Sequence, residues 1–157
     1  MNKDLRATLG GAVAGVAATL PMSAVMFAAK KAGLMGKYPA ELIAQKGLAA
    51  AGVQPSQGKT TTAALVAHFG FGAATGALFG LLYRRTQSLG PPVVRGIGYG
   101  LAVYTASYAG WIPAADIMPP PTADRPGRQP SMIVAHMVFG AALADLVDGF
   151  VAQKSET

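Results

Sequence analysis

The sequence has no cysteine and few charged residues, and each absence excludes a class of protein. Without cysteine, disulfides, thiolate nucleophiles and cysteine-ligated zinc or iron–sulfur sites are excluded. Charged residues make up 13% of the 157 positions, against roughly 25% in a typical soluble domain. A soluble fold of this size needs a charged surface, whereas hydrophobic residues make up 52% of this chain. The composition therefore predicts a protein embedded in the lipid bilayer.

The charges that are present are mostly positive and give a net charge of +6. In a soluble protein this balance would suggest nucleic-acid binding. Here the Lys and Arg residues lie between apolar runs, where they would meet lipid headgroups. We therefore expect no nucleic-acid partner.

Four apolar runs are long enough to cross a bilayer, which requires about 20 mostly apolar residues. The third is followed by three prolines, which cannot continue a helix. We expect the first run to be a retained helix and not a removed signal peptide. The sequence thus predicts an all-α membrane protein, a single transmembrane domain (1–157) built as a four-helix bundle. The four predicted spans are 7–29, 61–83, 96–118 and 131–153.

The segment between the first two spans contains one further helical pattern. Pro39 would stand in its first turn, and Leu42, Ile43 and Leu48 give it an apolar side. The pattern predicts a short amphipathic helix, which either lies on the membrane surface or packs on the bundle.

Positive residues are concentrated in short segments on the side of both termini. Because such segments favour the cytoplasm, we predict a multi-pass membrane protein with both termini cytoplasmic.

A nine-residue pattern, V-A-H-x-x-F-G-A-A, occurs at 66–74 and again at 134–142. A weaker echo relates 21–26 to 113–118 through a proline and a methionine at equal spacing. The two predicted hairpins, about 7–85 and about 94–153, would cross the membrane in the same sense. We therefore predict an internal parallel repeat with its axis along the membrane normal.

Small residues recur every four positions on each predicted span. Such faces let helix backbones approach closely, which holds helices together in lipid. Each histidine heads one of these stripes, so both should face the interior. The predicted packing glycines are Gly11, Gly15, Gly72, Gly76, Gly80, Gly96, Gly100 and Gly140.

His68 and His136 lie at matching depths, about one third of the way into their spans. Met22, Tyr108 and Trp111 are expected in the same layer, together with Thr19, Pro21 and Pro113. The imidazoles could ligate haem b, hold a metal or small ligand, or relay protons. Alternatively, each bonds a neighbouring group and only fixes the helices in register.

The fourth span also contains two intramembrane acids, Asp145 and Asp148. For Asp148, at the end of the span, a salt bridge or an interfacial position is expected. Asp145 could pair with Arg6, accept a bond from Thr8 or contact another subunit. Asp116 is expected at the interface, where Arg125 or Arg128 of the following loop could neutralise it.

No nucleophile–base arrangement, phosphate-binding loop or H-E-x-x-H helix is present, so the sequence gives no support for an enzyme. We expect an accessory or scaffolding subunit of a larger membrane complex, or a homo-oligomer, because the small-residue faces outnumber those that four helices need. A haem-binding electron-transfer subunit with a bis-histidine site is the first alternative, and small-molecule or proton transport the second.

Three segments, 11–26, 110–113 and 135–140, carry a G-x-x-A-G-x-x-A-T stretch, a W-x-P helix end and an A-H-x-x-F-G helix start. In these the chain resembles small uncharacterised bacterial inner-membrane proteins of the YagU-like group. The resemblance implies a multi-pass protein of the bacterial inner (cytoplasmic) membrane without an assigned activity, and no site residue follows from it.

Overall fold

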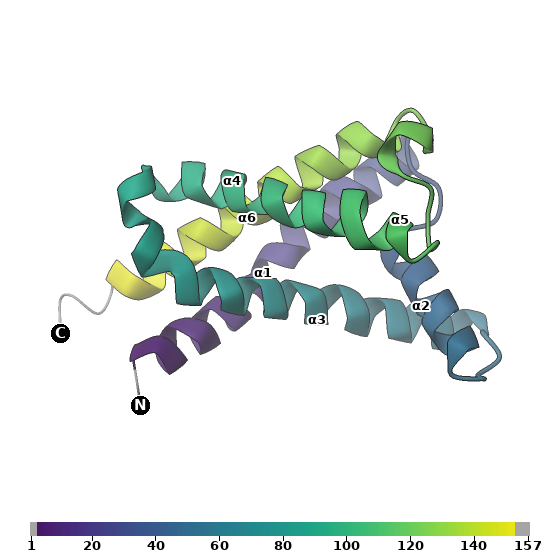
Figure 1. Ribbon diagram of the computed structural model, residues 1–157, viewed down its shortest axis with the longest axis horizontal. Helices are drawn as coiled ribbons and strands as arrows, with labels where there is room; N and C mark the ends of the chain where they lie inside the picture. Colours follow the sequence, from purple (N-terminus) through teal and green to yellow (C-terminus); the bar gives the residue numbers. More distant parts are fainter. Residues whose placement is uncertain (1–2, 153–157) are drawn as a thin grey trace.

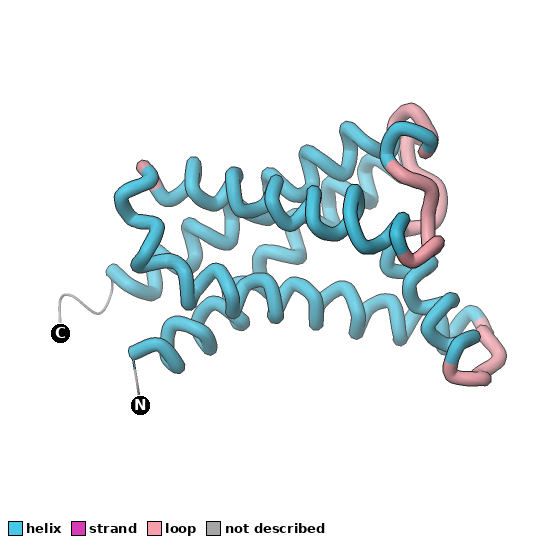
Figure 2. The backbone as a smooth tube through the Cα atoms, viewed as in Figure 1, coloured by secondary structure: helices cyan, strands magenta, loops and turns pink. Residues whose placement is uncertain are grey.

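The computed structural model describes residues 3–152, and every regular element in that range is helical (Figures 1 and 2). The predicted all-α class is therefore confirmed for these residues. Short 3₁₀ segments, η1 (Arg84–Leu89) and η3 (Pro121–Ala123), and a π-helical turn, η2 (Ser107–Trp111), connect the α-helices. The α-helices are α1 (Lys3–Lys31), α2 (Pro39–Ala50), α3 (Gln57–Tyr83), α4 (Pro92–Ala106), α5 (Ile112–Ala114) and α6 (Arg128–Ala152).

Three helices, α1, α3 and α6, are long and apolar enough to cross a membrane. They contain the first and second predicted spans and the described part of the fourth, and they mark the chain as a membrane protein. The predicted end of the fourth span, Gln153, lies outside the described residues.

The third predicted span consists of α4, η2 and α5, which follow one another without a break. Its predicted end at Met118 is wrong, because the helix already ends at Ala114. Asp116 adopts a left-handed conformation with φ 52°. The amide of Ile117 donates to the carbonyl of Ile112 (3.1 Å), and that of Asp116 to Pro113 (3.0 Å). These two bonds form a Schellman motif, which satisfies the last carbonyls before the prolines are reached.

Both ends of the described chain lie at the same end of the molecule as η1 (Figure 1). The loops that follow α1 and α5 lie at the opposite end. Helix α1 packs against α3 and α6, and α4 packs against α6. At the η1 end, α4 also reaches α3, where the Tyr99 hydroxyl donates to the carbonyl of Thr75 (2.6 Å).

Glycines allow α1 and α3 to touch backbone to backbone. A Cβ placed on Gly15 would lie 2.9 Å from the Cα of Gly76, and one on Gly11 would lie 2.9 Å from the Cα of Gly80. Real Cβ atoms do not approach other atoms so closely, so a larger residue at either site would force the helices apart. Gly72 meets the side chain of Thr19 in the same way.

The α4–α6 pair is built on the same principle. A Cβ on Gly96 would lie 2.8 Å from the carbonyl carbon of Gly140, and one on Gly100 would lie 3.2 Å from the Cα of Gly140. All eight glycines predicted to pack are therefore in interhelical contacts within the chain.

The predicted helix after the first span is α2, which packs against α3. The Lys46 ammonium group also donates to the carbonyl of Ala115, beyond α5. The structure thus shows this helix packed on the bundle, and a position at the membrane surface stays a prediction.

A histidine-lined cavity as the candidate functional site

A cavity of about 430 Å³ lies between α3 on one side and α4, η2 and α5 on the other. Residues of α1 and α6 form its floor, and the start of α2 closes one end. Phe71 on α3 and Trp111 on η2 line it and are still 40% and 42% exposed, so they form its mouth. This volume falls within the usual range for small-molecule sites, roughly 300–1,000 Å³.

The cavity brings together all five residues predicted as ligand or haem candidates: Met22, His68, Tyr108, Trp111 and His136. Thr19 also lines it, whereas Pro21 and Pro113 of the predicted layer do not. That the five candidates bind a ligand stays a prediction, but their side chains line the same cavity.

His136 is 3% exposed, and one of its ring nitrogens is hydrogen-bonded to the backbone of its own helix. Its Nδ1 lies 2.7 Å from the carbonyl oxygen of Met132, and its ring packs edge-on against Tyr104 (5.5 Å between centroids). A carbonyl can only accept, so Nδ1 carries the hydrogen. In the neutral ring, Nε2 then keeps its lone pair, and it has no partner in the part of the chain that the structure describes.

His68 has the opposite tautomer. Its Nε2 lies 3.1 Å from the hydroxyl oxygen of Ser23. That hydroxyl donates its one hydrogen to the carbonyl of Thr19 (2.7 Å), so towards His68 it must accept. Nε2 of His68 therefore carries the hydrogen, and Nδ1 keeps the lone pair.

The π-helical turn η2 shapes the wall opposite α3. Pro113 has no amide hydrogen, and in an α-helix its ring would clash with the carbonyl of Ala109. A wider turn at Ser107–Trp111 accommodates it, and π-turns are frequent at functional sites. The Ser107 hydroxyl donates to the carbonyl of Val103 (2.6 Å), which anchors the turn.

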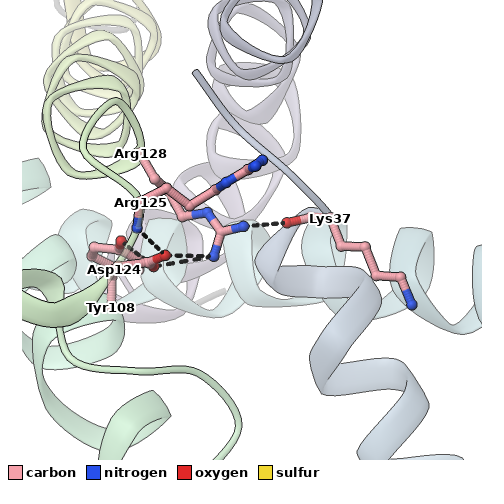
Figure 3. Close-up of polar contacts among 5 residues, drawn as sticks. All are labelled: Lys37, Tyr108, Asp124, Arg125 and Arg128. Carbon is pink, nitrogen blue, oxygen red and sulfur yellow. Dashed lines mark hydrogen bonds and ion pairs between the residues drawn. The ribbon is translucent and has the colours of Figure 1, made fainter. Parts of the chain in front are cut away.

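A buried ion pair holds Tyr108 in place (Figure 3). The Tyr108 hydroxyl donates to Asp124 (2.8 Å), and the Arg128 guanidinium lies 3.0 Å from the same carboxylate. These two charged side chains are only 3% and 7% exposed. Arg128 also reaches the carbonyl of Lys37 (3.4 Å) and so joins the two loops at this end.

This ion pair shows that one of the two predicted partners of Asp116 is wrong, and it includes an acid, Asp124, that the sequence interpretation did not indicate. The following loop does not neutralise Asp116 through Arg128, because Arg128 pairs with Asp124. The sequence interpretation did not single out Asp124. The spacing of four between Asp124 and Arg128, just before an apolar run, is the signal that could have found it.

The two acids of α6 have different surroundings. Asp148 accepts a hydrogen bond from the Tyr83 hydroxyl, and Arg95 donates to that same hydroxyl (3.2 Å). Asp145 is exposed and bonds to neither Arg6 nor Thr8. Thr8 instead donates to the carbonyl of Asp4 (2.8 Å).

A second cavity of about 290 Å³ adjoins the first and shares His68, Met26 and Ala40 with it. It leads towards Tyr38 and Glu41 at the start of α2. Burial, and then the charge of Glu41, raise the pKa of the Tyr38 hydroxyl, so this group remains a neutral donor at physiological pH.

Among residues 3–152, no three His, Cys, Asp or Glu side chains come together in a way that could hold a metal ion. Comparisons with protein-family models, with curated proteins and with solved structures found no match. The geometry of the cavity therefore carries the functional argument.

Proposed function

We propose that this chain is a four-span membrane protein that binds a small, largely apolar molecule in the cavity between α3 and α4–α5. The observation that carries the proposal is the cavity itself, about 430 Å³ with a mostly apolar lining and two histidines. Apolar walls with a few placed polar groups are typical of ligand sites. Its mouth lies between helices, so a ligand dissolved in the bilayer can enter from the side.

The proposal counts α4–η2–α5 as the fourth span. It is a continuous helical stretch, Pro92–Ala114, and at about 1.5 Å per residue it reaches roughly 34 Å, enough for a hydrocarbon core of about 30 Å.

We further propose that the two hairpins are a parallel repeat. The glycine of the repeated pattern packs on a glycine of the preceding helix in both halves, Gly72 on Gly15 and Gly140 on Gly96. In this alignment of the two hairpins, Gly15 corresponds to Gly96. The weaker echo, which aligns 21–26 with 113–118, would instead pair Gly15 with Ser107, so the two alignments are incompatible. The echo is therefore left out of the proposed repeat.

The accessory-subunit or homo-oligomer role stays a prediction. It was based on surplus small-residue faces, and the eight glycines that form those faces are in contacts within the chain. The exposed carboxylate of Asp145 on α6 is the feature that still favours contact with another subunit. A position for the termini on the cytoplasmic side likewise stays a proposal from the charge pattern.

Trp111 gives a direct test, because it is the only tryptophan in the chain and lines the cavity. We expect 4-bromophenol, whose bromine quenches indole fluorescence, to quench Trp111 saturably in detergent-solubilised protein. Ala74→Phe should abolish the saturable part, because Ala74 lines the cavity. Val66→Phe is the control, because Val66 is 69% exposed on the same helix and does not line the cavity. Quenching that never saturates would refute the proposal.

Haem binding is the second candidate, because His68 and His136 line one cavity. Nε2 of His136 is available as an axial ligand, whereas Nε2 of His68 is bonded to Ser23. Protein from haem-supplemented cells should then show a Soret band that His68→Ala/His136→Ala lacks. If the band is absent, or is unchanged in the double variant, haem is ruled out.

A further inference from the structure

The hydroxyl groups that line the cavity have all donated their hydrogens to the protein. The Thr19 hydroxyl donates to the carbonyl of Gly15 (2.8 Å), and the Thr75 hydroxyl to that of Phe71 (2.8 Å). The remaining two are Ser107, bonded to a backbone carbonyl, and Tyr108, bonded to Asp124. A hydroxyl has one hydrogen, so towards the cavity these four groups present only oxygen lone pairs.

The N–H group of each imidazole is likewise already used in a hydrogen bond within the protein. His136 uses Nδ1–H on a backbone carbonyl, and His68 uses Nε2–H on Ser23. A charged ring is costly inside a membrane, and in the neutral ring the other nitrogen is an acceptor. His136 lines the cavity and its Nδ1 is bonded to Met132, so Nε2 is the ring nitrogen left for a bound molecule.

Donors remain only at the edges. The Trp111 indole N–H lies at the exposed mouth, and the amide of Ala40 belongs to the first turn of α2, where helix amides have no intrahelical partner. Inside the cavity, the polar groups of the otherwise apolar lining are therefore hydrogen-bond acceptors.

From this accounting, and given the proposed function, we infer that the cavity selects apolar molecules carrying a hydroxyl or N–H group over analogues that can only accept. An alcohol or phenol gives its hydrogen to Nε2 of His136, so its own donor is paired. A ketone, quinone or ether brings a further acceptor to a site without interior donors. An anion meets only lone pairs and is excluded.

The test compares 4-bromophenol with 4-bromoanisole, which differ only in the O–H hydrogen and its methyl replacement. Both quench Trp111, and tryptophan octyl ester in the same micelles gives the quenching due to partitioning alone. After this correction we expect the phenol to bind about fivefold more tightly, the factor that corresponds to a net hydrogen bond of about 1 kcal/mol.

Variants test whether Nε2 of His136 is the acceptor that causes the preference for the phenol. His136→Phe keeps a ring of similar size but removes the acceptor, so it should bind both probes with nearly equal affinity. Thr105→Val is the matched control, because the Thr105 hydroxyl also donates to a backbone carbonyl, that of Leu101 (2.9 Å), but does not line the cavity, so its removal should leave the preference intact. His68→Phe measures the contribution of the second imidazole.

The outcomes separate this inference from the function on which it rests. If both probes bind saturably with equal affinity, or if the ether binds better, the selectivity is refuted while the binding function stands. If the preference persists in His136→Phe and in His68→Phe, the acceptor is not an imidazole and the inference fails. If neither probe quenches saturably, the proposed function itself fails.

Discussion

The closeness of the α4–α6 contact can be tested with two glycines two residues apart. A Cβ on Gly96 would lie 2.6 Å from the Cβ of Ala144 and 2.8 Å from the carbonyl carbon of Gly140. A Cβ on Gly98 would meet no atom within 4 Å. Both positions lie inside α4, so replacement by alanine gives the same gain in helix propensity, up to about 1 kcal/mol.

Because that gain is common to both variants, their difference isolates the cost of overpacking. Inserting a methyl group into a filled contact typically costs about 1–3 kcal/mol. We therefore expect the free energy of unfolding of Gly96→Ala to be about 2 kcal/mol lower than that of Gly98→Ala. Gly98→Ala should be at least as stable as the natural chain.

The assay is reversible unfolding in mixed micelles, with SDS as the denaturant and circular dichroism as the readout of helix content. Equal stabilities for the two variants would refute the packing described here, because they would show that Gly96 is as open as Gly98. Binding of 4-bromophenol should also weaken in Gly96→Ala, since separation of α4 from α6 displaces one wall of the cavity.

Further predictions concern the ion pair, the end of α5 and the mouth of the cavity. Asp124→Asn leaves the buried Arg128 charge unpaired and should cost about 3–5 kcal/mol of unfolding free energy; Asp145→Asn, at an exposed site, should change it little, and equal effects would contradict the burial. Asp116→Gly removes a side chain from a left-handed conformation and should stabilise the chain by about 1 kcal/mol in the same assay; a loss of stability would show that the Asp116 side chain itself supports the turn. Trp111, 42% exposed, should be quenched by acyl-brominated lipids in vesicles, and no quenching would place the mouth away from lipid.

Much of the helical framework could be predicted because it depends on local patterns. Length and hydropathy alone indicate the spans, and the small-residue spacing of four identified the faces on which Gly15, Gly72 and Gly140 pack. Matching depth in the two spans placed His68 and His136 in one layer, and both line the same cavity. Hydrocarbon restricts a chain to few arrangements, which makes such patterns informative.

The features that could not be predicted depend on contacts distant in sequence. The end of the helix at Ala114 follows from backbone geometry around Asp116 and not from the prolines that come after it. The pairing of Asp124 with Arg128 depends on how two loops meet. The tautomers of the histidines depend on which atoms of Ser23 and Met132 face them. No periodicity in the sequence encodes these distances.

The proposal that a small apolar molecule occupies the histidine-lined cavity is tested most directly by locating one there. Crystals of the protein soaked with 4-bromophenol would reveal each bromine by its anomalous X-ray scattering. We predict a bromine peak inside the space bounded by Ala67, Phe71 and Trp111, with the phenol oxygen within hydrogen-bonding distance of Nε2 of His136. Bromine peaks only on the outer, lipid-facing surfaces of the helices would contradict the proposal.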